Sequence, residues 1–143
     1  MILRRACSAV ALASVVVLAA CEQLAEPNPS VPVDFTFGII HIATEPAFVV
    51  EPAGGELRVR GSFTTPCQPY NATASADLSG STLVLRVVGR ATGACPHDVV
   101  TSVAYHANIQ IAPSAYSRLR VIHEWRDANW PAETPIDTVF AAN

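Results

Sequence analysis

The chain has 143 residues, a formal net charge of −3 and only 15% charged side chains. Half of its residues are hydrophobic, so a packed core is expected and general disorder is excluded. All nine basic residues are arginine, and two of them, Arg4 and Arg5, lie in the N-terminal segment. The other arginines are outnumbered by twelve acidic residues, which argues against nucleic acid as a partner because nucleic acid needs a basic face.

The first twenty residues are predicted to be a secretory signal peptide. Arg4 and Arg5 precede an apolar run over residues 6–20, and small residues lie just before Cys21. This run is shorter than the roughly twenty apolar residues that span a bilayer, which favours cleavage. An uncleaved anchor and a soluble secreted product are the alternatives.

The residues Leu18-Ala19-Ala20-Cys21 resemble the lipobox of bacterial lipoproteins. The resemblance implies that Cys21 is lipidated, becomes the first residue of the mature protein and holds it in a membrane. Several acyl chains together anchor a protein firmly. Glu22 resembles a residue that permits sorting to the outer membrane. We therefore expect the protein in the bacterial cell envelope, on the outer membrane, facing the periplasm or the cell surface.

Residues 21–33 are predicted to be the lipidated cysteine and an extended linker, because three prolines occur there among polar and small residues. Residues 34–143 are then a single folded domain. Apolar and polar residues alternate in this domain with a period of two, which predicts half-buried antiparallel strands separated by Gly and Pro turns. About seven to eight short strands fit an all-β, single antiparallel β-sandwich better than a barrel.

One predicted strand carries small side chains on its inner face, at Ala72, Ala74 and Ala76. A close-packed core then needs large side chains opposite. The candidates are Phe35, Phe37, Phe63, Tyr105 and Trp125.

The segment Ile111-Ala112-Pro113-Ser114-Ala115-Tyr116, followed by Leu119 and Val121, resembles the Leu-x-Pro-Gly-x-Tyr turn of immunoglobulin-like and fibronectin type III-like bacterial modules. The resemblance implies a β-sandwich in which Tyr116 caps a corner by hydrogen bonding to upstream backbone. Ser114 stands where that family usually has Gly. The resemblance implies no activity, because such folds host many functions.

Two cysteines remain in the predicted folded domain, Cys67 and Cys95. In an exported domain such a pair is expected to form a disulfide. The alternative is a redox or nucleophilic thiol, for which the sequence offers no Cys-x-x-Cys motif.

The sequence predicts no enzyme, no metal site and no cofactor. His106 is expected to point outward from its strand and His123 inward, so this pair cannot share a metal ion. His97 and Asp98 are adjacent in a predicted loop, where solvated side chains are expected. An enzyme, the third hypothesis, would use His97 or His106.

Six arginines lie at outward positions of the predicted strands. If they line one sheet they could bind an acidic partner, since arginine is favoured at interfaces. The alternative is a solvated face with scattered acidic residues. The six are Arg58, Arg60, Arg86, Arg90, Arg118 and Arg120.

The resulting hypothesis is a lipid-anchored, non-catalytic module that binds a protein of the cell envelope or supports the envelope structurally. The alternative is a protease or other enzyme inhibitor that presents the disulfide-braced loop between Cys67 and Cys95. The membrane is the expected partner of the lipid on Cys21, and no small-molecule ligand is inferred. Residues 130–140 are expected to form a loop and an edge strand, which could pair with a strand of a partner.

Overall fold

The computed structural model describes residues 28–40, 48–65, 70–93, 101–126 and 130–140. Cys21 and the predicted signal peptide lie outside the described residues, as do Cys67 and Cys95. Within the described ranges the chain forms nine strands and one short 3-10 helix. These are β1 (Ser30–Val31), β2 (Val33–Ile40), β3 (Val49–Ala53), β4 (Glu56–Thr65), β5 (Tyr70–Ser79), β6 (Thr82–Ala91), β7 (Thr101–Ile109), η1 (Pro113–Ala115), β8 (Arg118–Arg126) and β9 (Glu133–Val139).

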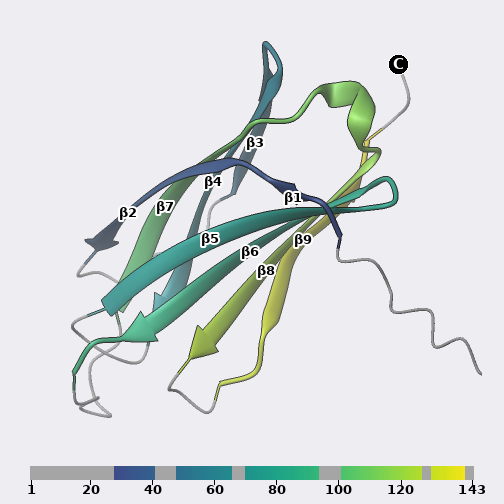
Figure 1. The fold of residues 1–143 in the computed structure, drawn as a ribbon. Helices are drawn as coiled ribbons and strands as arrows, with labels where there is room; N and C mark the ends of the chain where they lie inside the picture. The colour runs from purple at the N-terminus through teal and green to yellow at the C-terminus, as the bar shows by residue number, and fades with distance from the viewer. Residues whose placement is uncertain (1–27, 41–47, 66–69, 94–100, 127–129, 141–143) are drawn as a thin grey trace, which may run out of the picture.

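The strands form two sheets that pack face to face, so the predicted β-sandwich is confirmed (Figure 1). One sheet has the order β1-β5-β6-β8-β9 and the other has the order β2-β7-β4-β3. Only Pro32 separates β1 from β2, yet these strands pair with β5 and β7 in different sheets. The start of the domain therefore crosses from one layer of the sandwich to the other.

Strand pairing departs from the predicted antiparallel arrangement in one place. β6 and β8 run parallel, with Thr82 opposite Arg118 and Arg90 opposite Arg126. Parallel neighbours need a long crossover connection. Here the chain leaves β6, crosses to the other sheet as β7 and returns as β8. The two hairpins β5–β6 and β8–β9 are thereby placed side by side in one sheet.

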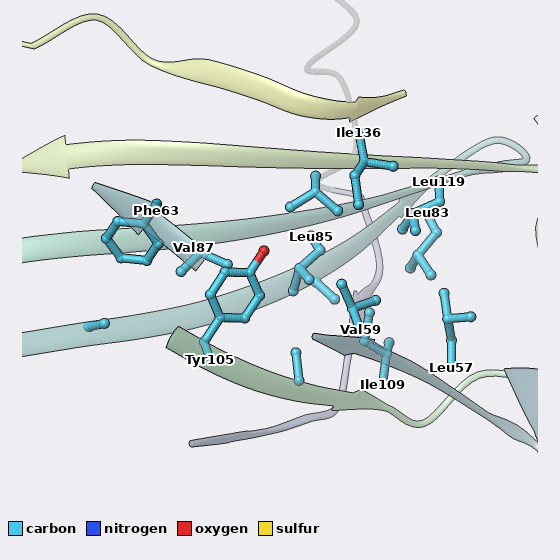
Figure 2. Close-up of a cluster of buried hydrophobic side chains, with 14 of the residues drawn as sticks. Leu57, Val59, Phe63, Leu83, Leu85, Val87, Tyr105, Ile109, Leu119 and Ile136 are labelled. Atoms are coloured by element: carbon cyan, nitrogen blue, oxygen red, sulfur yellow. The ribbon is translucent and has the colours of Figure 1, made fainter. Parts of the chain in front are cut away.

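The core lies between the sheets and follows the predicted alternation (Figure 2). Successive side chains of a strand point to opposite faces, so every second residue is buried. Fully buried side chains come from four central strands, two in each sheet: Leu57 and Val59 of β4, Leu83, Leu85 and Val87 of β6, Val103, Tyr105 and Ile109 of β7, and Leu119 and Val121 of β8.

The alanines of β5 lie where the sheets come together at one side of the sandwich. Ala72 and Ala76 are buried in the same core cluster as Phe63, Tyr105 and Trp125, and Ala74 is partly buried against that cluster. Phe35 is half-buried, but Phe37 is 38% exposed, so the expectation fails for that ring. Both rings lie on β2, an edge strand, and Phe37 is the nearer of the two to the C-terminal end of that strand.

Tyr116 lies just after the η1 turn and is buried. Its ring packs edge-on against Phe140, with 5.4 Å between the ring centroids. Burial raises the pKa of the Tyr116 hydroxyl. The tail after residue 130 forms β9, an edge strand paired with β8, as the sequence predicts. The described ring contact of Tyr116 is thus with Phe140, the residue that follows β9.

In the part of the chain that the structure describes, no helix is both long enough and apolar enough to cross a bilayer.

Candidate functional site

The structure divides the six predicted arginines between the two outer faces of the sandwich. Arg58 and Arg60 belong to β4 of the four-stranded sheet. Arg86 and Arg90 of β6, and Arg118 and Arg120 of β8, belong to the five-stranded sheet. The six therefore do not line one sheet, and the alternative, an exposed surface with acidic residues scattered among the arginines, describes Arg58 and Arg60. The arginines lie on different outer faces because their strands belong to different sheets, and the alternation of apolar and polar residues does not show to which sheet a strand belongs.

Five of these arginines form ion pairs with carboxylates in the described structure, and Arg90 has an interaction partner as well. Arg118 Nε donates to Asp137 Oδ1 at 2.5 Å, and Arg120 Nη2 donates to Asp137 Oδ2 at 3.1 Å. The hydrogen bonds from both arginines lower the pKa of Asp137, and the one from Arg118 has the larger effect. The remaining pairs are Arg86–Glu124 at 2.6 Å, Arg58–Glu56 at 2.6 Å and Arg60–Glu51 at 3.1 Å.

A different arrangement lies at the far end of β6 and β8. Arg90 and Arg126 are direct neighbours across the parallel strand pair, and Asn71 of β5 lies opposite Arg90. These residues line a hollow of about 280 Å³ together with Thr73 and Ser75. The hollow therefore gathers two cations and several hydrogen-bonding side chains on one outer face, and we call it the arginine hollow.

The histidines separate as the sequence predicts. His106 is exposed on the outer face of the four-stranded sheet, with Thr36 and Arg60 as its neighbours on the adjacent strands. His123 is buried in the interior. His41 and His97 lie outside the described residues. Among the residues that are described, no three His, Cys, Asp or Glu side chains lie together as a metal site would require.

His123 and Tyr105 form a buried hydrogen bond between the two sheets. The Tyr105 Oη and His123 Nε2 atoms are 3.0 Å apart, and the donor depends on the tautomer of the imidazole. Burial lowers the pKa of His123 to about 4 and raises that of Tyr105. Both groups are thus neutral at pH 7, and each is a hydrogen-bond partner for the other in the core.

Aromatic rings surround this pair and extend to the surface. The His123 ring centroid lies 5.0 Å from that of Phe63 and 5.9 Å from that of Phe48. A pocket of about 220 Å³ opens beside these rings. We call it the side pocket, and its lining includes Phe48, Phe63, Thr64, His123, Trp130 and Glu133.

Of the two cations in the arginine hollow, the sequence pointed to Arg90 but not to Arg126. Arg126 is separated from Arg118 and Arg120 by an even number of residues within β8, so alternation could have placed it on the same face of the sheet. Its pairing with Arg90 follows only from the parallel register of β6 and β8. Phe48 lies far from Trp130 and Glu133 in the sequence, and no pattern of residues joins it to them.

We compared the chain with models of protein families, with curated proteins and with solved structures, and found no match in any of the three comparisons.

Proposed function

We propose that this protein is an exported, lipid-anchored, non-catalytic module that binds an acidic partner in the bacterial cell envelope. The lipobox resemblance at Cys21 and the proline-rich segment after it support anchoring near a membrane. The β-sandwich would then present its outer faces to neighbouring molecules. The resemblance to immunoglobulin-like modules is part of this proposal and supplies a precedent for a binding role, not an activity.

One observation carries the proposal: Arg90 and Arg126 lie opposite each other on neighbouring strands and both line the arginine hollow. Arginine forms bidentate hydrogen bonds with carboxylates, so two adjacent guanidinium groups suit an acidic surface of another protein. Asn71, Thr73 and Ser75 add hydrogen-bonding groups around them.

The alternative, an enzyme inhibitor, rests on the loop between Cys67 and Cys95. These cysteines lie outside the described residues. The neighbouring strand ends support a bridge, because Thr65 pairs with Thr101 and Tyr70 pairs with Ala91 at one end of the sandwich. Inhibition of a panel of proteases by the purified domain would favour this alternative.

Crosslinking in living cells followed by mass spectrometry tests the leading proposal. We expect a specific envelope protein to be captured by the wild type and lost with Arg126→Glu. Arg58→Glu is the matched control, because it reverses a charge on the opposite outer face. Capture that survives Arg126→Glu, or that is lost equally with Arg58→Glu, would contradict a role for the hollow.

The anchor is tested separately by the mass of the mature N-terminus. We expect acyl chains on Cys21, and we expect Cys21→Ser to release the protein from the membrane fraction. An N-terminus that begins at Met1 would contradict cleavage.

A further inference from the structure

We propose that the side pocket binds a small organic cation with dispersed charge, of the quaternary ammonium class. This site is independent of the arginine hollow, because it lies at the interior edge of the sandwich and not on the outer face of the five-stranded sheet.

The pocket exists because β3 covers only part of β4. The register of β3 ends with Val49 opposite Arg60, while β4 continues to Thr65. In Figure 1, β3 is correspondingly the shorter strand of the pair. Beyond that point Phe48 turns toward the interior, where its ring lies beside His123. In the described part of the chain, no strand pairs with β4 beyond this point on the side of β3, and Trp130 lines the pocket there.

Three aromatic side chains, besides the His123 imidazole, line the pocket. Phe63 is buried, Phe48 is half-buried and Trp130 is 41% exposed. Trp130 is held in place by an edge-on contact with Trp125, at 5.7 Å between ring centroids. Ring faces attract cations, and this attraction is strongest for tryptophan. Aromatic rings that line a pocket therefore suit a cationic group.

The described lining of the pocket carries a negative charge. Glu133 lies directly opposite His123 on the neighbouring strand and is exposed. Of the described side chains that line the pocket, Glu133 is the only one charged at pH 7, because burial lowers the pKa of His123 to about 4. An anion is therefore disfavoured. A hard metal ion would need several oxygen ligands, and one carboxylate beside a neutral imidazole does not supply them.

The size of the pocket limits the ligand. Pockets for drug-sized molecules have volumes of roughly 300–1,000 Å³. At about 220 Å³ the side pocket is smaller. It fits a trimethylammonium head group, whose methyl groups would contact the rings while Glu133 balances the charge.

Choline chloride is the probe for the test, and 3,3-dimethyl-1-butanol is its neutral analogue of the same shape. The full chain is kept in maltoside micelles, which contain no ammonium group. We expect the methyl proton resonance of choline to broaden in a saturable way, while the neutral alcohol binds more weakly. Equal binding of the two probes, or no saturable broadening with choline, would overturn the proposal.

Two variants assign the binding to the pocket. Trp130→Leu should weaken choline binding by about 2- to 30-fold, the range of a single cation–π contact. Glu133→Gln should weaken binding of choline and leave that of the alcohol unchanged, an effect that a purely structural role would not produce. Glu51→Gln is the matched control, because Glu51 is also an exposed strand glutamate but pairs with Arg60. Choline binding that is insensitive to both pocket variants would also overturn the proposal.

Discussion

Tyr105 and His123 join the two sheets of the sandwich through a single buried hydrogen bond of 3.0 Å. Tyr105 belongs to β7 and His123 to β8, and their rings meet edge-on at 5.7 Å between centroids. Figure 2 shows the Tyr105 hydroxyl pointing into the core among apolar side chains. A polar pair at this depth is stable only while both partners are neutral and bonded to each other.

This relationship predicts how stability depends on pH. The pKa of His123 falls from 6.5 to about 4 on folding because of burial. The unfolded chain therefore binds more protons than the folded one in this window, and the free energy of unfolding decreases as the pH falls from 6.5 towards 4. A shift of this size corresponds to roughly 3 kcal/mol.

Urea denaturation of wild type and His123→Gln across this pH window measures the contribution. Other acids titrate in both proteins, so the difference between the two curves isolates His123. If the free energy of unfolding changed equally with pH in the two proteins, His123 would not be a neutral buried group.

Tyr105→Phe removes the hydroxyl and leaves His123 Nε2 without this partner in the core. We expect a loss of about 1–3 kcal/mol in the free energy of unfolding, the cost of an unsatisfied buried polar group. Tyr116→Phe is the control, since the described contact of that ring is packing against Phe140. An equal loss in both variants, measured by denaturation midpoints, would argue against the hydrogen bond.

Gly61 is predicted to be intolerant of any side chain. A Cβ atom built there would lie 2.6 Å from Tyr105 Oη and 2.8 Å from Phe48 Cδ1. Gly61→Ala should therefore displace both rings and destabilise the fold by about 1–3 kcal/mol, as overpacked cores do. Gly38→Ala is the control, because nothing lies within 4 Å of its added Cβ. Thermal unfolding of the two variants checks the contrast, and similar midpoints would contradict it.

The disulfide between Cys67 and Cys95 remains a prediction of the sequence. Without reductant we expect neither cysteine to react with an alkylating reagent in the unfolded protein, as read by intact mass. The bridge would close a loop of about 29 residues and stabilise the fold by roughly 3.6 kcal/mol in the chain-entropy model. Two alkylated cysteines without reductant would exclude it, and Cys67→Ser should lower the unfolding midpoint if it forms.

The sequence determined the fold class because the residues of one strand alone show which of its two faces is buried. Alternation with a period of two assigns the inward positions, and Leu85, Val121 and His123 are buried as that pattern predicts. The outward position of His106 and the edge position of β9 follow from the same local signals.

Only the tertiary structure decided which strands are neighbours. The parallel pairing of β6 with β8 places Arg90 beside Arg126, and the sheet order places Arg58 and Arg60 on the opposite face. The side pocket likewise depends on where the pairing of β3 with β4 ends. The physical reason is that strand pairing joins residues far apart in the chain, through backbone hydrogen bonds that are the same for every side chain. Alternation therefore fixes the face on which a residue lies, whereas its neighbours on that face are fixed by the fold.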